Sequence, residues 1–245
     1  MEILILGHKG LLGNMVKKYF EFSKINVSVI NSNIRWNSVE FKEYLLNNKY
    51  DFIINCIGAI PQRTKDFSIN YTLPIWLSNN VKSKIIHPGT DCEMDTDEYG
   101  ISKKKSRDYI IDNSENTKII KTSIIGPELN THFSLMDWFL SNKDNDEVNG
   151  FVNHKWNGNT TLTWAKFCLE IINNWDKYQK ETILYSDCVS KYEILNHIND
   201  TFGRKIKILK KETDNVDKCL LGEIKMPNIK DQIKELKYFI DEFTN

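Results

Sequence analysis

Short apolar runs alternate with amphipathic segments along the first half of the chain, and short polar turns separate them. Each apolar run predicts a buried β-strand, and these runs cover residues 2–6, 26–30, 51–58, 84–89 and 117–126. Helical spacing of the apolar residues between them predicts helices over residues 11–22, 38–47, 66–80 and 99–112. This alternation predicts an α/β fold, a doubly wound parallel sheet with helices on both faces.

The second half of the chain has a less regular pattern. It predicts helices and extended segments in the order 133–141 (helix), 150–158 (extended), 160–174 (helix), 181–186 (strand), 190–202 (helix), 205–211 (strand) and 228–243 (helix). We interpret residues 1–126 as a dinucleotide-binding domain. Residues 127–245 are then a smaller C-terminal substrate lobe, with some segments returning to the sheet. Open α/β sheets bind ligands at the carboxyl ends of their strands, so we expect the lobe over that edge.

A glycine motif supports the Rossmann-type form of this fold. Gly7, Gly10 and Gly13 have G-x-x-G-x-x-G spacing, directly after the first predicted strand and at the start of a helix. Such glycines let the backbone turn tightly and approach a pyrophosphate at a helix N-terminus. The cofactor contacts expected in this loop are Gly7, Lys9, Gly10, Leu11, Leu12 and Gly13.

The second predicted strand is followed by Asn31, Ser32 and Asn33, with no acidic residue to bind a free ribose 2′-hydroxyl. Lys9 and Arg35 are close enough in sequence to meet a 2′-phosphate, with Ser32 beside them. This favours NADPH (NADP) over NADH. The alternative is that both cations are ordinary surface charges.

Tyr99 and Lys103 are four residues apart, so they share one face of the predicted helix. A neighbouring ammonium and a cationic nicotinamide are expected to lower the tyrosine pKa, so that the phenol exchanges a proton near neutrality. Thr90 follows the fourth predicted strand, where a hydroxyl would polarise a substrate carbonyl. The alternative for Thr90 is that it caps a turn with Asp91. Thr90, Tyr99 and Lys103 are the predicted catalytic residues.

Composition excludes several other functions. The 245 residues carry 33 Lys and Arg and 33 Asp and Glu, so no basic excess indicates nucleic-acid binding. No apolar run reaches the length of a membrane span. The five cysteines have no C-x-x-C or zinc-site spacing, so we expect reduced thiols, no metal and a cytoplasmic location.

The chain resembles the dTDP-4-dehydrorhamnose reductase-like branch of the extended short-chain dehydrogenase/reductases. The stretches that carry the resemblance are GHKGLLG (7–13), NCIGAIPQ (55–62), HPGTDC (87–92), YGISK (99–103), KTSIIGPE (121–128) and FVNHKWNGNTTLTWAKF (151–167). They span most of the chain in the expected order. The chain departs from the family between Thr90 and Tyr99, where only the acidic residues 91–98 stand in place of a longer insertion that helps wall the sugar pocket.

The resemblance implies site residues. Thr90, Tyr99 and Lys103 are the implied catalytic trio, with Tyr99 and Lys103 also contacting the nicotinamide cofactor. Further implied cofactor contacts are Cys56, Ile57, Gly58, Ala59, Ser123, Ile124 and Ile125. Substrate contacts are expected from Thr90, Asp91, Tyr99, His132, Asn153, Lys155 and Trp156, although Trp156 is equally well interpreted as a core residue. Relatives in this family are often homodimers, and the helices at 66–80 and 99–112 are candidate interface surfaces.

These features predict an NADPH-dependent reductase acting on the 4-keto group of a nucleotide-diphospho-deoxysugar, with the hydride from nicotinamide and the proton from Tyr99. One alternative is an NAD-dependent sugar-nucleotide epimerase or dehydratase that keeps its cofactor bound. Another is a non-catalytic nucleotide-binding subunit of the same fold. The intact Thr90–Tyr99–Lys103 set favours an enzyme.

Overall fold

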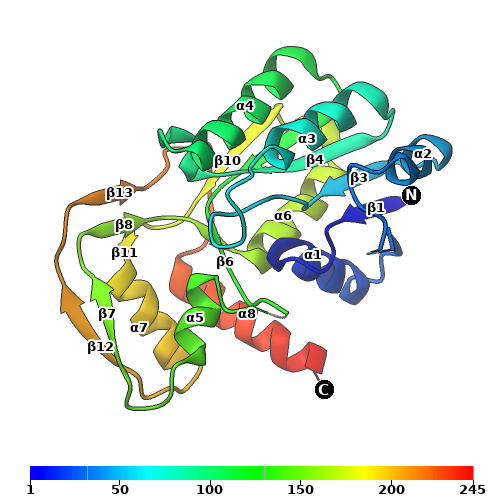
Figure 1. Ribbon diagram of the computed structural model, residues 1–245. Coiled ribbons are helices and arrows are strands. Elements are labelled where there is room, and N and C mark those ends of the chain that lie inside the picture. The colour runs from blue at the N-terminus through cyan, green and yellow to red at the C-terminus, as the bar shows by residue number, and fades with distance from the viewer. Residues whose placement is uncertain (32, 130, 245) are drawn as a thin grey trace. The chain divides into compact units, whose positions relative to one another are not determined.

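The computed structural model describes residues 1–31, 33–129 and 131–244 (Figure 1). Its α-helices are α1 (Leu11–Phe22), α2 (Val39–Asn47), α3 (Ile69–Asn80), α4 (Glu98–Asn113), α5 (Leu135–Ser141), α6 (Thr161–Asn173), α7 (Lys191–Thr201) and α8 (Ile229–Thr244). Two short 3₁₀ helices are η1 (Asp91–Met94) and η2 (Trp175–Lys177). The strands are β1 (Ile3–Leu6), β2 (Val27–Val29), β3 (Phe52–Asn55), β4 (Lys84–Gly89), β5 (Thr117–Lys121), β6 (Ile124–Ile125), β7 (Glu147–Phe151), β8 (His154–Trp156), β9 (Asn159–Thr160), β10 (Glu181–Tyr185), β11 (Val189–Ser190), β12 (Lys207–Lys211), β13 (Val216–Lys218) and β14 (Ile224–Lys225).

The main sheet has seven strands in the order β14-β10-β5-β4-β3-β1-β2. Neighbouring strands run parallel, with Ile3 opposite Phe52 between β1 and β3, and Gly89 opposite Lys121 between β4 and β5. The order reverses beside β1, since β2 pairs on one side of it and β3 on the other. The predicted doubly wound, Rossmann-type sheet is therefore confirmed.

The described chain divides into two compact units. The first comprises Met1–Lys121 and Ala165–Thr182, and the second comprises Thr122–Trp164 and the chain from Ile183 onward. The first unit thus holds the glycine loop and the Thr90–Lys103 stretch, and α6 and β10 each pass from one unit into the other.

Helices cover both faces of the sheet in the first unit, with α3 and α4 on one face and α1 on the other (Figure 1). On the first face, Leu4 and Ile53 belong to a buried cluster with α2 and α3 residues such as Phe41 and Leu73. On the opposite side, α1 buries Met15, Val16 and Phe20. Burial of these side chains from both faces explains why β1 and β3 read as continuous apolar runs.

The predicted strand at 117–126 is wrong in its second half. β5 ends at Lys121, and Ile124–Ile125 form β6, which pairs with β9 away from the main sheet. Buried amide hydrogen bonds hold this departure, because Asn159 donates its side-chain amide to Thr122 and its backbone N–H to Ser123. Periodicity alone does not reveal the break, since the apolar run continues through it.

The second unit contains three small sheets, β11-β8-β13, β12-β7 and β6-β9. Cys188 and Cys219 form a disulfide beside them, with their Cα atoms 5.9 Å apart. The expectation that all five cysteines are reduced is therefore wrong for this pair, because the fold brings two residues distant in sequence within bonding range. Cys56, Cys92 and Cys168 carry free thiols. The absence of a metal stays a prediction; the Cys188 and Cys219 sulfurs lie within 4.8 Å of an Asp217 carboxylate oxygen, but they are already bonded to each other.

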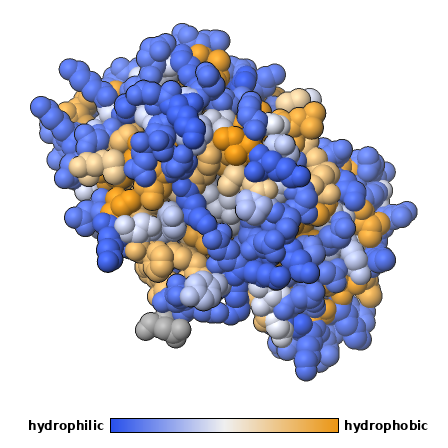
Figure 2. Space-filling view, turned by 180° about the vertical axis from the view of Figure 1, so that it is seen from behind, coloured by the Kyte–Doolittle hydropathy of each residue, from blue (hydrophilic) through white to orange (hydrophobic). Residues whose placement is uncertain are grey.

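Within the described residues, no helix is both long enough and apolar enough to cross a membrane. On the face drawn in Figure 2, hydrophilic residues predominate and apolar residues form small separate groups. This distribution agrees with the high content of charged residues, which make up 27% of the sequence.

Candidate active site

The glycine loop after β1 is a tight turn built from close backbone approach. Gly7 has a positive φ of 76°, and a Cβ on Gly13 would lie 2.3 Å from the Gly7 carbonyl oxygen. The N–H of Gly10 donates to that same carbonyl at 2.9 Å. Gly10 is also the N-cap of α1 and supplies no side-chain cap. The first N–H groups of α1 are therefore left to an anionic ligand, as a dinucleotide pyrophosphate requires.

One cavity lies beside this loop, and a second lies in the segment after β2. One, of about 200 Å³, is lined by Leu6, Gly7, His8, Lys9, Ile30, Asn31, Ile34, Phe41 and Ile57. The other, of about 560 Å³, is lined by Asn33, Arg35, Trp36 and Asn37. Lys9 thus lines the cavity beside the glycine loop, and Arg35 lines the cavity that follows β2. Ser32, the third residue expected at a 2′-phosphate, lies outside the described residues.

The segment after β3 is held by a buried asparagine. Asn70 of α3 accepts the N–H of Ala59 at 2.7 Å and donates to the Ala59 carbonyl oxygen at 3.0 Å. Its amide also donates to Ser102 of α4 at 3.1 Å. Cys56, Ile57 and Ala59 are half-buried and Gly58 is exposed. No pattern in the sequence indicates that Asn70 holds this segment. The backbone expected along the cofactor is thus tied to the helix that carries Tyr99.

Thr90 lies directly after β4 and makes the capping contact with Asp91 that the sequence offered as one alternative. Its catalytic role stays a prediction. Its hydroxyl accepts the N–H of Cys92 at 3.3 Å and so caps η1. The same hydroxyl donates to the Asp91 carboxylate at 2.9 Å, and Asp91 is buried. A carbonyl that receives this proton must therefore compete with Asp91 for it. The Cys92 thiol also donates to this Asp91 carboxylate oxygen, at 3.7 Å.

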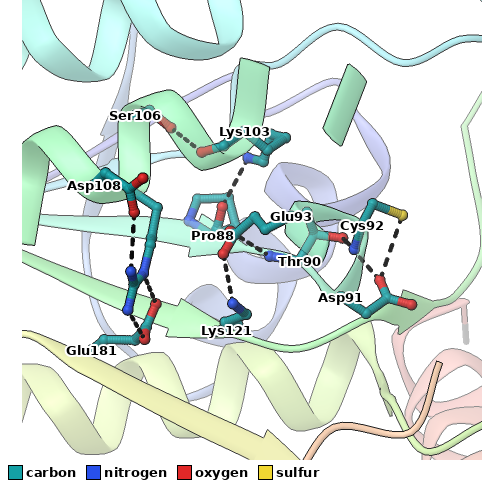
Figure 3. Close-up of polar contacts among 11 residues, drawn as sticks. Pro88, Thr90, Asp91, Cys92, Glu93, Lys103, Ser106, Asp108, Lys121 and Glu181 are labelled. Carbon is teal, nitrogen blue, oxygen red and sulfur yellow. Dashed lines mark hydrogen bonds and ion pairs between the residues drawn. The ribbon is translucent and has the colours of Figure 1, made fainter. Parts of the chain in front are cut away.

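Tyr99 and Lys103 lie on α4, which begins one residue before the tyrosine. The Asp97 side chain caps this helix by accepting the Gly100 N–H at 2.7 Å. The Tyr99 ring packs edge-on against Phe67, with the ring centres 5.7 Å apart. Tyr99 is half-buried, whereas Lys103 is 9% exposed. Lys103 donates its ammonium to the Pro88 carbonyl oxygen at 2.9 Å, at the end of β4 (Figure 3).

The expectation that Lys103 lowers the pKa of Tyr99 is wrong in this structure. Burial raises the tyrosine pKa above its ordinary value, and the neighbouring Cys92, Asp91, Glu93 and Asp97 raise it further. Lys103 donates its ammonium to the Pro88 carbonyl oxygen, and the pKa of Tyr99 is raised with Lys103 on the same helix. The phenol is therefore protonated throughout the physiological pH range.

The acid-rich segment between Thr90 and Tyr99 contains a buried ion pair that the sequence reasoning missed. The Glu93 carboxylate lies 2.7 Å from the Lys121 ammonium, and the two side chains are 3% and 9% exposed (Figure 3). Burial lowers the pKa of Lys103, and the Glu93 carboxylate opposes that lowering. The first part of residues 91–98 folds as η1, and Asp91, Cys92 and Glu93 all contact Thr90.

His87 is a buried histidine on β4, three residues before Thr90. It is 3% exposed, and its Nδ1 lies 3.2 Å from the side-chain amide nitrogen of Asn55 on β3. Burial and the charge of Lys103 lower its pKa well below the ordinary value. His87 is thus a neutral imidazole within range of the Lys103 charge.

The remaining predicted residues lie in the second unit. Ser123, Ile124 and Ile125 lie at β6. His132 is exposed, with Nδ1 4.0 Å from the Asp137 carboxylate. Asn153 uses its side-chain amide to hold Thr213, through both its nitrogen and its oxygen. Trp156 is 8% exposed and packs against Gly158, which agrees with the core interpretation, and Lys155 beside it is half-buried.

No protein-family model matches the sequence. A search of curated proteins likewise finds no match. Solved structures do match. A dTDP-4-dehydrorhamnose reductase from Bacillus anthracis, in complex with NADP, aligns with a TM-score of 0.80 at 13% identity, covering 98% of this chain and 99% of that one. An orthologue from Clostridium acetobutylicum aligns with a TM-score of 0.74 at 17% identity, covering all of both chains.

A dTDP-glucose 4,6-dehydratase from Bacillus anthracis, in complex with NAD, has a TM-score of 0.72 at 13% identity, with 99% and 97% covered. The chain therefore has the fold of the extended short-chain dehydrogenase/reductases. The resemblance inferred from the sequence is confirmed at the level of fold, and dTDP-4-dehydrorhamnose reductases are among the structural neighbours. At these identities the fold does not choose between reductase and dehydratase.

Proposed function

We propose that this protein is an NADPH-dependent reductase of the 4-keto group of a nucleotide-diphospho-deoxysugar. The observation that carries the proposal is that Thr90, Tyr99 and Lys103 lie together at the carboxyl end of β4. Thr90 follows β4, and α4, which carries Tyr99 and Lys103, packs on η1 and reaches the Pro88 carbonyl of β4. All three residues lie in the same unit as the glycine loop after β1. The substrate class is supported by the sequence resemblance and by structural neighbours described as dTDP-4-dehydrorhamnose reductases.

The residues of the first unit fit a nicotinamide dinucleotide. The backbone of Gly7, Gly10 and Gly13 and the uncapped start of α1 would hold its pyrophosphate. Lys103, with the segment from Cys56 to Ala59, would hold its nicotinamide half, to which the proposal also assigns Ser123, Ile124 and Ile125. When bound, the cofactor supplies a hydride.

Proton delivery falls to Tyr99 in this proposal. Reduction of a ketone adds a hydride to carbon and a proton to oxygen, so the enzyme needs a group that is protonated before the reaction. The raised pKa of Tyr99 keeps its phenol in that form. Thr90 would orient the carbonyl once its hydroxyl turns from Asp91, whose contact holds it at 2.9 Å.

The preference for NADPH rests on charge at the end of β2. Arg35 is exposed and lines the larger cavity, and Lys9 is exposed beside the smaller one. Asn31 and Asn33 occupy the positions where an acidic residue would bind a free 2′-hydroxyl. The proposal assigns substrate contacts to Asp91, which is buried and accepts a hydrogen bond from Thr90. It also assigns substrate contacts to four residues of the second unit, His132, Asn153, Lys155 and Trp156.

The decisive experiment is Tyr99→Phe, assayed by NADPH oxidation on a panel of 4-keto sugar nucleotides. Removing the proton donor is expected to lower kcat by about 10³-fold. The Kd for NADPH, measured by fluorescence, should change less than about threefold. Tyr109→Phe, on the same helix, is the matched control and should behave as wild type.

A variant that keeps wild-type rates would contradict the role of Tyr99. NAD released on denaturing the purified protein would favour the epimerase or dehydratase alternative. NADPH binding without oxidation across the whole panel would favour a nucleotide-binding subunit.

A further inference from the structure

Glu93 is a buried carboxylate three residues after Thr90 and six before Tyr99, and its two oxygens have different partners. One of its oxygens accepts the backbone N–H of Thr90 at 3.0 Å. The other lies 2.7 Å from the ammonium of Lys121, the last residue of β5. The same side chain therefore joins the end of β4, the helix η1 and the end of β5.

The neighbouring strand ends leave space for this pair. Gly89, the last residue of β4, lies opposite Lys121 in the parallel register. A Cβ on Gly89 would lie 3.0 Å from the Lys121 Cβ and 3.1 Å from the Glu93 carboxylate. Any side chain there would press on the ion pair, so glycine at this position and the pair form one packed arrangement.

The arrangement reaches Tyr99 through backbone contact. A Cβ on Gly100 would lie 2.3 Å from the carbonyl oxygen of Cys92, the residue before Glu93. The first turn of α4, which carries Tyr99, thus packs directly on the backbone of η1. Movement of Glu93 would displace Thr90 through its N–H and Tyr99 through this contact.

Charge gives a second connection. The Glu93 carboxylate opposes the lowering of the Lys103 pKa by burial, and it raises the pKa of Tyr99. The titratable and charged groups that face Tyr99 and Lys103 from β4, η1 and α4, with Lys121 from β5, are His87, Asp91, Cys92, Glu93, Asp97 and Lys121. Among the carboxylates named here, Glu93 is the one that contacts Thr90 and also acts on both Lys103 and Tyr99.

We propose that Glu93, held by Lys121, is a positioning residue that fixes Thr90, Tyr99 and Lys103 in their working geometry and charge state. The inference rests on the proposed function, because Thr90, Tyr99 and Lys103 are its proposed catalytic residues. It assigns no contact with substrate to Glu93. A buried ion pair is a poor source of stability, because desolvation of the two charges offsets their attraction. Its place here is better explained by the geometry that it enforces on its neighbours.

Glu93→Gln tests this, because glutamine keeps the oxygen that accepts the Thr90 N–H and removes the charge. We expect kcat to fall roughly 10- to 100-fold, with KM for NADPH changed less than about threefold. The alkaline limb of the kcat profile should move to lower pH, since the pKa values of Lys103 and Tyr99 both fall without the carboxylate.

Glu181→Gln is the matched control. Glu181 also accepts two hydrogen bonds from a cation, Arg107, at 2.9 and 2.8 Å, and it lies at the start of β10, away from Thr90 (Figure 3). The same chemical change there should leave kcat and its pH profile unaltered. Loss of stability in both variants with loss of kcat in only one separates positioning from general folding.

The double variant Glu93→Gln, Lys121→Met removes both charges and guards against a variant that fails to fold. Its melting temperature should exceed that of Glu93→Gln, while its kcat stays low. Recovery of kcat together with stability would overturn the positioning role, and so would a Glu93→Gln enzyme with wild-type kcat and pH profile.

Hydrogen exchange distinguishes failure of this inference from failure of the proposed function. If the wild type oxidises no NADPH on the panel, the proposed function fails. Exchange of the Thr90 amide and of residues 98–103 still reports on Glu93, and it should quicken in Glu93→Gln and not in Glu181→Gln. Unchanged exchange would contradict the inference whether or not the wild type is active.

Discussion

The two ends of the candidate site in the first unit are built in different ways. The glycine loop after β1 depends on the absence of side chains at Gly7 and Gly13, because this absence lets the two backbone segments touch. The Thr90 end works through side chains with opposing charges, since Glu93 and Lys121 are buried together beside Lys103. The first end is therefore sensitive to added volume, and the second to lost charge.

The largest effect is expected from Gly13→Ala. The new Cβ would lie 2.3 Å from the Gly7 carbonyl oxygen, and neither backbone segment has room to yield. We expect the free energy of unfolding to fall by about 3 kcal/mol, measured by urea denaturation, and NADPH binding to be lost.

Gly10→Ala is its matched control. Gly10 has an ordinary φ of −82°, and an added Cβ would lie 3.4 Å from the same carbonyl oxygen. Alanine is only a weaker N-cap than glycine, so the cost should stay under about 1 kcal/mol. Equal losses in the two variants would contradict the account of close backbone approach.

A pH dependence of stability is the next largest effect, and it belongs to the charged end. The folded pKa of His87 is depressed, so below the unfolded pKa the unfolded chain binds a proton that the folded chain does not. Stability is therefore full above about pH 6.5 and falls as pH drops towards the folded pKa, by at most about 1.4 kcal/mol per pH unit from this group.

His87→Asn should flatten this fall in urea midpoints between pH 7 and pH 5. His8→Asn is the comparison, because His8 is only half-buried and its pKa is lowered less completely. A slope that persists unchanged in His87→Asn would show that other groups carry the dependence.

The smallest effect concerns the cap of the helix that carries Tyr99. Asp97→Ala removes the carboxylate that accepts the Gly100 N–H at 2.7 Å, and it should cost about 1 kcal/mol of unfolding free energy. Asp97→Asn keeps a capping oxygen and should cost less than half as much. The shift is measured as a change in urea midpoint at constant m-value, and equal costs would assign the effect to charge instead of capping.

Much of the first unit could be predicted from the sequence, because its signals are local. Apolar runs predicted β1 and β4 to within one residue, the predicted strand at 51–58 overran β3 by three residues, and glycine spacing located the loop at Gly7. Thr90, Tyr99 and Lys103 are near one another in sequence, so one helix and one strand end suffice to bring them together. Their roles in catalysis stay predictions.

The features that were missed depend on distant contacts. In the sequence Glu93 does not differ from the other acidic residues of its segment, and only the fold places Lys121 of β5 beside it. Cys188 and Cys219 are likewise brought together only when the second unit folds. The pKa of Tyr99 was misjudged for a similar reason. Spacing shows that Lys103 is near, but not that its ammonium is already bound to the Pro88 carbonyl.

The contacts of Glu93 with Thr90 and Lys121 also determine where the segment between Thr90 and Tyr99 can accept a change in length. Glu93 secures the Thr90 side of that segment, and the Asp97 cap secures the side that leads into α4. Met94, between the two anchors, is 78% exposed. An engineer who wants a longer or differently shaped pocket wall has a natural insertion point there, where new residues can be added while both anchored ends keep their places.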